Sequence, residues 1–333
     1  MQTLSQSQLQ AALGAAEDAA ASPQERAEML MEIAMGLQRR PESAQQITDA
    51  IHLYQRALEL APVAAVLLRA RIGARLGTAL QALPDCGDGR GVDNLERALA
   101  SLQAALPALE TQGTPEEAAE VELNQGLVQQ ALAASGRARI QDAINTYLRA
   151  LRVFTREAYP QEFAILHNNL AIAYLSIPAT DERSRLREAL AVQSFEEVLK
   201  VINLIDHPSE YAMVNNNLGN ALQVASSSHV VENHLRALAA YDEALRVRNP
   251  RDTPLEYANT ISNKANVLRC LVPDAARDVS QADLRDPLAD ALALVREAHQ
   301  LFTRHGDAHK AQLMSQATAE IEAELAQRRQ LAN

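Results

Sequence analysis

The chain has 333 residues, of which 47% are hydrophobic, 22% charged and 3% aromatic, with no tryptophan. This apolar content is enough to bury a core, which argues against disorder, and the abundance of Ala, Leu, Gln, Glu and Arg favours helix throughout. The formal net charge of -11 repels a phosphate backbone, and no run of Lys and Arg with interleaved aromatics offsets it, so we expect no nucleic-acid partner.

Residues 1–22 predict an N-terminal capping helix, centred on residues 5–20. Acids and glutamines stand where a signal peptide needs a basic start and an unbroken apolar core. No window reaches the roughly 18 apolar residues of a membrane span. The two cysteines, Cys86 and Cys270, lie far apart and outside any CxxC pair. We therefore expect a cytoplasmic protein with reduced cysteines and no membrane partner.

Residues 23–305 predict six repeats that start near residues 23, 62, 115, 160, 208 and 254. Each start is a proline, which suits the first turn of a helix that we call helix A. Eleven residues after each proline stands a Gly or Ala, where a second helix would have to approach closely. The prolines are Pro23, Pro62, Pro115, Pro160, Pro208 and Pro254, and the small residues are Ala34, Gly73, Gly126, Ala171, Gly219 and Ala265.

Each repeat continues with a second helix, helix B, after a polar loop of variable length. In helix B an aromatic or large apolar residue stands three before a small one, as in Tyr147 with Ala150 and Tyr241 with Ala244. An A/B pair is apolar on two sides and cannot bury both alone, so neighbouring pairs must stack. The sequence therefore predicts an all-α fold, an α-α superhelix in the form of a right-handed solenoid of about six helix pairs.

Residues 306–333 predict one long final helix. Met314, Ile321 and Leu325 fall on one face of it, and charged residues fall elsewhere. Because the last repeat of a stack would otherwise expose an apolar flank, we interpret this segment as a C-terminal capping helix.

The fifth repeat, EYAMVNNNLGNALQ followed by RALAAYDEALRVRNP, resembles a tetratricopeptide repeat (TPR). The fourth repeat matches almost as well, the third and sixth match in part, and the first two match in their small residues and helical period. The resemblance implies a TPR-like helical repeat protein whose A helices line a concave groove, with inserted residues at 225–232 and 272–285. The matching signature positions are Leu218, Gly219, Leu222, Ala237, Tyr241, Ala244 and Pro250.

In that family the groove-lining positions are offsets +5, +8, +9 and +12 from the start of helix A. They include several Met and Leu residues in the first three repeats and carry mainly Asn in the last three. An Asn side chain both donates and accepts, which suits the backbone of an extended peptide, although the same amides could bond to neighbouring backbone instead. The predicted groove comprises Met31, Met35, Leu67, Leu123, Leu127, Asn124, Asn168, Asn169, Asn216, Asn217, Asn220, Asn259, Asn263 and Asn266.

Some family members clamp the carboxylates of a partner's C-terminus with Lys and Arg in this groove. Here only Arg71 and Lys264 lie near suitable offsets, in repeats far apart along the chain. We therefore expect no preference for a free acidic C-terminus.

Residues for catalysis or metal binding are not evident in the sequence. His229 and His234 are spaced so that they do not share a helix face, and Gly306 interrupts the helix that would align His305 with His309. The chain has no glycine-rich phosphate loop, no GxSxG turn and no HExxH motif. We expect no enzyme activity, no metal and no cofactor.

The preferred interpretation is a non-catalytic, protein-binding scaffold or assembly chaperone that holds a protein or peptide partner in the groove. One alternative is a structural homodimer formed through an apolar flank or the final helix. A second follows from the segment between HNNLAIAYLSIP and YANTISNKANVL, which resembles repeat proteins encoded with bacterial metalloenzymes such as hydrogenases and implies a maturation accessory. A peptide-sensing transcription regulator would need a basic DNA-binding head, and the leading helix is too short and too acidic for one.

Overall fold

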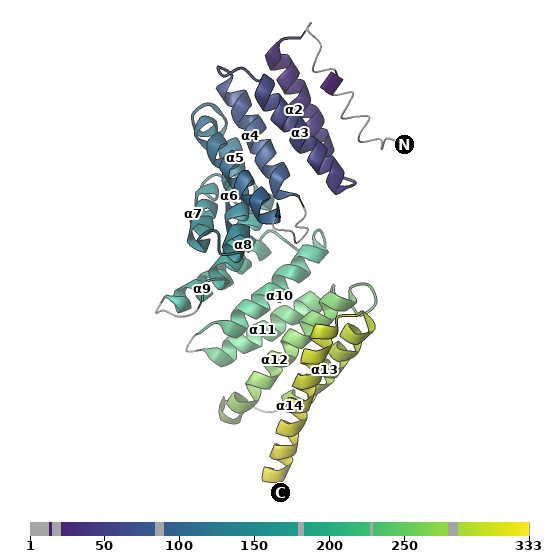
Figure 1. Ribbon diagram of the computed structural model, residues 1–333. Helices are drawn as coiled ribbons and strands as arrows, with labels where there is room; N and C mark the ends of the chain where they lie inside the picture. Colours follow the sequence, from purple (N-terminus) through teal and green to yellow (C-terminus); the bar gives the residue numbers. More distant parts are fainter. Residues whose placement is uncertain are drawn as a thin grey trace. The chain divides into compact units, whose positions relative to one another are not determined.

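The computed structural model describes residues 13–14, 21–83, 90–178, 183–226, 229–278 and 286–332, and every regular element in these ranges is a helix (Figure 1). The A helices are α2 (Pro23–Arg39), α4 (Val66–Gln81), α6 (Pro115–Ala134), α8 (Pro160–Leu175), α10 (Pro208–Val224) and α12 (Pro254–Asp278). The B helices are α3 (Ala44–Leu60), α5 (Arg90–Gln112), α7 (Ile140–Ala150), α9 (Ser184–Leu199), α11 (Val230–Leu245) and α13 (Pro287–Arg304), and α14 (Ala308–Ala332) closes the described chain.

The chain forms two compact units, residues 1–169 and 170–333, with the boundary inside α8. In unit 1 the pairs α2/α3, α4/α5 and α6/α7 pack along one another, and in unit 2 the pairs α10/α11 and α12/α13 do so. Successive A helices also approach each other, α2 to α4, α4 to α6 and α10 to α12, whereas the described B helices make no comparable approach. Within each unit the A helices therefore share one inner surface, which we call the A-face.

Helix starts follow from local capping. Ser22 and Glu25 form a capping box at the start of α2, with Ser22 N donating to Glu25 Oε2 at 2.8 Å and Glu25 N donating to Ser22 Oγ at 3.3 Å. Thr114 and Glu117 do the same at the start of α6. Each box satisfies backbone donors that the first turn of a helix leaves unpaired, and a proline follows as the first helical residue.

The second repeat departs from the predicted register. Pro62 lies in the connector before α4, whose first residue is Val66. Residues 61–65 form a turn in which Ala65 N donates to the carbonyl oxygen of Pro62 at 2.9 Å. The prediction that Pro62 opens helix A is therefore wrong, by four residues, because this proline is used in a turn.

The same shift moves the position of close helix contact. A Cβ placed on Gly77, eleven residues after Val66, would lie 2.6 Å from Leu102 Cγ, whereas one on Gly73 would meet nothing closer than 3.8 Å. Gly77, and not the predicted Gly73, is thus where α5 packs tightly against α4.

Buried tyrosines of the B helices lie directly against glycines of the A helices. An added Cβ on Gly126 would be 2.3 Å from Cε1 of Tyr147, and one on Gly219 would be 2.5 Å from Cε1 of Tyr241. Both tyrosines are buried. A side chain on either glycine would therefore have to displace a buried ring.

Three buried tyrosines also donate their hydroxyls to amide oxygens on helix A. Such a bond keeps the buried hydroxyl paired, and burial raises the pKa of each of these tyrosines above its ordinary value. The bonds join Tyr54 to Gln38 Oε1 at 2.8 Å, Tyr147 to Gln130 Oε1 at 2.9 Å and Tyr241 to Asn220 Oδ1 at 2.8 Å.

Two connectors between repeats share one turn, with the sequence pattern N-x-x-D-x-P. Oδ1 of Asn203 and Oδ1 of Asn249 each accept from the backbone N–H groups two and three residues later. The Nδ2 groups of these asparagines donate to Asp206 and Asp252. The turn delivers the chain to the prolines that begin α10 and α12.

At the C-terminal end, α12 continues to Asp278, so residues 272–278, expected in an inserted loop, are helical. α14 packs along α13, and its Ala311 and Ile321 are buried. The predicted leading helix lies outside the described residues except for Leu13 and Gly14. In the described part of the chain, no helix is both long enough and apolar enough to cross a membrane.

Candidate peptide-binding surface

The A-face of unit 1 is more polar than the sequence suggested. Counted from the observed start at Val66, the face of α4 carries Arg71, Ala74, Arg75 and Thr78. Leu67, predicted to line the groove, instead packs half-buried against the core of unit 1. The expectation of an apolar surface in the second repeat is therefore wrong, and the four-residue shift in register is the reason.

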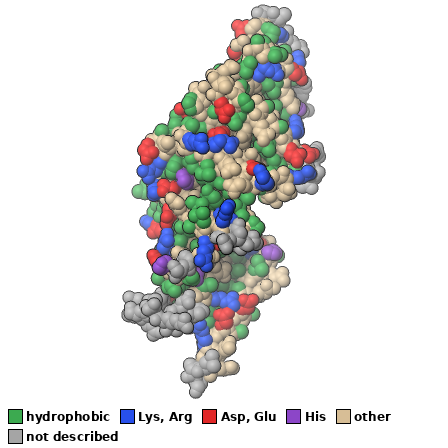
Figure 2. Space-filling model, turned by 90° about the vertical axis from the view of Figure 1, so that its left-hand side faces the viewer, with side chains coloured by type: hydrophobic (Ala, Val, Ile, Leu, Met, Phe, Trp, Pro, Cys, Tyr) green, Lys and Arg blue, Asp and Glu red, His purple; other side chains and the backbone are tan. Residues whose placement is uncertain are grey.

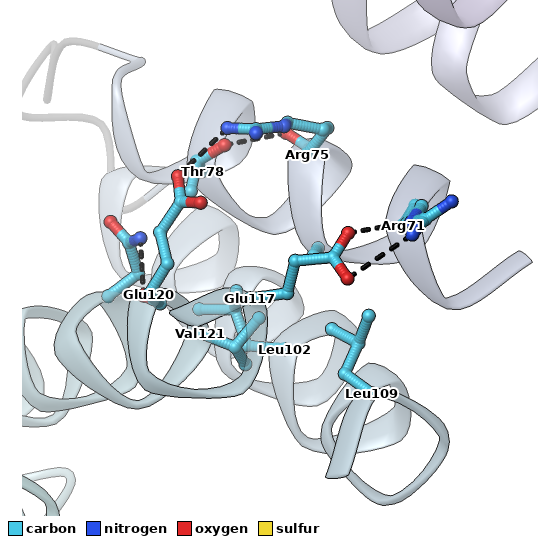
Figure 3. A pocket seen from close by; sticks show the side chains of 10 residues that line it. Arg71, Arg75, Thr78, Leu102, Leu109, Glu117, Glu120 and Val121 are labelled. Carbon is cyan, nitrogen blue, oxygen red and sulfur yellow. Dashed lines mark hydrogen bonds and ion pairs between the residues drawn. The ribbon is translucent and has the colours of Figure 1, made fainter. Parts of the chain in front are cut away.

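Two ion pairs join α4 to α6 across this surface. Arg71 Nε donates to Glu117 Oε1 at 2.6 Å and its Nη2 donates to Glu117 Oε2 at 3.2 Å. Arg75 Nη1 donates to Glu120 Oε1 at 2.9 Å. Glu117 and Glu120 project from α6 toward the arginines of α4 (Figure 3). All four side chains remain partly exposed, so the pairs stabilise the fold only slightly.

A small hollow lies between these ion pairs. Its floor is the buried, apolar set Leu102, Leu109 and Val121, and Ala74 and Asn124 also line it. The cavity volume of about 40 Å³ has room for only a few water molecules. The hollow is therefore too small for a metabolite and suited at most to one side chain.

Glu117 is held in its charged form. The hydrogen bonds from Arg71 lower the pKa of this carboxyl, and the backbone N–H of Thr114 lowers it further against an opposing effect of burial. Glu117 therefore serves both the cap of α6 and the link to α4.

The other four apolar residues predicted to line the groove are also half-buried. Met31 and Met35 lie on α2 and pack against the core of unit 1. Leu123 and Leu127 lie on α6, each beside Asn124 in helical register. The A-face thus mixes half-exposed apolar residues with the charged and amide side chains of their neighbours.

An asparagine occupies the same position, +9, in four A helices. We call Asn124, Asn169, Asn217 and Asn263 the Asn column; all four are half-buried. Nδ2 of Asn124 donates to the carbonyl of Glu120 at 2.8 Å, and Nδ2 of Asn169 donates to that of Ile165 at 2.8 Å. Among the described residues no donor reaches Oδ1 of Asn124 or Asn169. These two side chains are held against their own helices with an acceptor available.

No family model matches the chain, and no curated protein matches it. Similar solved structures include BtubC (BKLC) from P. vanneervenii, with 19% identity over 75% of this chain and 96% of that one, at a TM-score of 0.49. The apo form of RapI has 14% identity over 90% and 99% of the two chains, at a TM-score of 0.48. A Rap protein complexed with Competence and Sporulation Factor has 13% identity over 97% and 98%, at a TM-score of 0.30.

The fold is a TPR-like helical repeat. Helices pair in sequence order, small residues of helix A meet large residues of helix B, and α14 follows the last pair. At these identities and TM-scores the similar structures assign no partner to this TPR-like chain.

Three predicted groove asparagines of unit 2, Asn216, Asn220 and Asn263, have partners inside the fold. Asn216 is 8% exposed, and its Oδ1 accepts from Thr260 Oγ1 at 3.2 Å and from Nδ2 of Asn263 at 3.3 Å, which ties α10 to α12. Asn220 accepts the hydroxyl of Tyr241. These contacts show that some of the amides stabilise the repeat stack.

The remaining asparagines differ from one another. Oδ1 of Asn259 accepts from Lys310 Nζ of α14 at 2.9 Å, so the final helix covers part of the predicted groove. Asn266 is exposed. Oδ1 of Asn168 is buried without a hydrogen-bond partner among the described residues.

Both cations that the sequence placed near the groove are engaged, Arg71 with Glu117 and Lys264 with Asp242. Lys and Arg lie interspersed with Asp and Glu on the face shown in Figure 2. Within the described ranges, no three His, Cys, Asp or Glu side chains come together in a group that could hold a metal ion.

Proposed function

We propose that this chain is a non-catalytic scaffold that holds an extended segment of a partner protein along its A-face. The observation that carries the proposal is the Asn column, Asn124 and Asn169 in unit 1 and Asn217 and Asn263 in unit 2. A single half-exposed asparagine is common, but the same side chain at one position of two A helices in each unit gives the A-face of that unit a repeated chemical property.

The chemistry of that surface suits a peptide backbone. An extended chain offers one N–H and one C=O per residue, at intervals of about 3.4 Å. An asparagine can meet either group, and it does so without selecting a side chain. Asn124 and Asn169 are already pinned to their own helices, so they lose little side-chain freedom when a ligand arrives.

A scaffold of this type needs no catalytic residue, and we assign none. We place it in the cytoplasm, where an exposed, unpaired thiol such as that of Cys270 remains reduced. The narrower role that we assign to the chain is that of an assembly chaperone. Asparagines that bind the backbone of a client segment would hold that segment before it folds.

The test is a pull-down from the host's cytosol with wild-type protein and the double variant Asn169→Ala/Asn217→Ala. We expect the wild type to retain one partner and the variant to lose it while its thermal unfolding stays within a few degrees. Gln103→Ala is the matched control, since it removes an exposed amide from α5, outside the A-face, and should retain the partner. Equal recovery by the double variant, or recovery of a second copy of this chain alone, would count against the proposal.

A further inference from the structure

The hollow between α4 and α6 opens beside the Asn column, because Asn124 is one of its lining residues. A segment bound through its backbone to Asn124 would carry a side chain past this opening. Side chains of an extended segment point alternately to opposite sides, so every second one would face the surface. The hollow is therefore positioned to accept one side chain of the bound segment.

The floor of the hollow favours an apolar group. The apolar side chains of Leu102, Leu109 and Val121 line the floor and are at most 3% exposed, while the charged and polar residues of α4 and α6 line the walls around them. The cavity volume of about 40 Å³ suits a methyl or isopropyl group, whereas an aromatic ring would have to push the two ion pairs apart.

The walls of the hollow reject charge. Arg71 donates two hydrogen bonds to Glu117, and Glu117 also accepts a hydrogen bond from the backbone N–H of Thr114. An incoming carboxylate would have to displace Glu117 or Glu120 from its arginine, and an incoming ammonium would have to displace an arginine. Either exchange leaves one partly exposed charge without its partner, and an incoming carboxylate would also face the negative charges of Glu117 and Glu120, which disfavours acidic ligands.

We propose that this hollow is a selectivity pocket for a small, uncharged aliphatic side chain of the partner segment, and that Glu117 and Glu120 are the residues that exclude acidic ones. This inference rests on the proposed function and names the class of segment that the A-face of unit 1 takes. Ala, Val or a residue of similar size would occupy the pocket.

The experiment is a positional-scanning array of immobilised short peptides, built on a Ser/Thr/Gly background with Gly, Val, Phe, Asp or Lys at each position in turn. Wild-type protein is compared with Ala74→Leu, which fills the hollow from α4, and with Glu117→Gln/Glu120→Gln, which frees both arginines. Ala104→Leu adds the same bulk to an exposed site of α5 outside the hollow.

For the wild type and for Ala104→Leu we expect one peptide position at which the Val peptide binds roughly tenfold more tightly than the Asp, Lys or Phe peptide. Ala74→Leu should lose this preference while still binding the Gly peptides. Glu117→Gln/Glu120→Gln should bind the Asp peptides at least about tenfold better than the wild type does, because a peptide carboxylate can then pair with Arg71 or Arg75.

Four results would overturn the inference. Unchanged Val preference in Ala74→Leu would place the selectivity elsewhere. Unchanged rejection of Asp in Glu117→Gln/Glu120→Gln would remove the role of the two glutamates. Peptide binding that depends on Asn169 and Asn217 but selects no side chain would contradict the pocket and leave the proposed function standing, whereas no peptide binding at all would contradict both.

Discussion

Gly126→Ala is expected to destabilise the protein by about 1–3 kcal/mol, the usual cost of overpacking a core. The new Cβ would lie 2.3 Å from Cε1 of Tyr147, and this ring is 1% exposed and has its hydroxyl bound to Gln130. Neither the ring nor α6 can shift without disturbing the packing of the pair. Urea unfolding followed by circular dichroism measures the loss as a lower midpoint.

Gly36→Ala is the matched control, since Gly36 lies inside α2 and a Cβ there meets nothing within 4 Å. It should stabilise by about 0.5–1 kcal/mol, because glycine disfavours a helix interior. The pair Gly77→Ala and Gly73→Ala tests the register of α4 in the same way. If Gly73→Ala were the more harmful of these two, the assignment of Gly77 as the contact position would be wrong.

Asn216→Ala and Asn217→Ala are expected to differ sharply although the residues are adjacent. Removing Asn216 takes an acceptor from Thr260 and Asn263 in a buried site and should cost about 1–3 kcal/mol. Asn217 is half-buried, and its one side-chain bond to other described residues is a long 3.5 Å contact from Asn216, so its loss should change stability by less than about 0.5 kcal/mol.

Thermal and urea unfolding of the two single variants measure this contrast directly. Binding of the recovered partner should show the opposite order, with Asn217→Ala weakened more than its stability loss explains. Equal destabilisation by both variants would mean that the Asn column is part of the packing of the repeats.

The order of the helices could be predicted from the sequence, because prolines, glycines and the spacing of apolar residues determine helix starts and helix faces locally. Five of the six A helices begin at the predicted prolines. The failure at Pro62 has a local cause as well, since two glycines one turn apart, Gly73 and Gly77, both fit the pattern of small residues, and only contact with Leu102 distinguishes them. The N-x-x-D-x-P turns were a sequence signal that could have fixed the starts of α10 and α12 independently.

The character of the A-face could be predicted only in part. Adjacent residues on a helix point about 100° apart, so whether Asn216 or Asn217 meets the next helix depends on how α12 packs against α10. The ion pairs from Arg71 and Arg75 join residues 46 and 45 positions apart in the sequence. Such contacts follow from the stacking of repeats, which no local pattern encodes.

The most direct test of partner binding on the A-face is site-specific photo-crosslinking. A benzophenone side chain replaces Met213, one turn before Asn217 on α10, or Leu235 on α11. These residues are 40% and 44% exposed, so the two variants should be equally stable. The account predicts a crosslink to the partner from position 213 and little from position 235. A crosslink mainly from position 235, or from 213 only to a second copy of this chain, would contradict it.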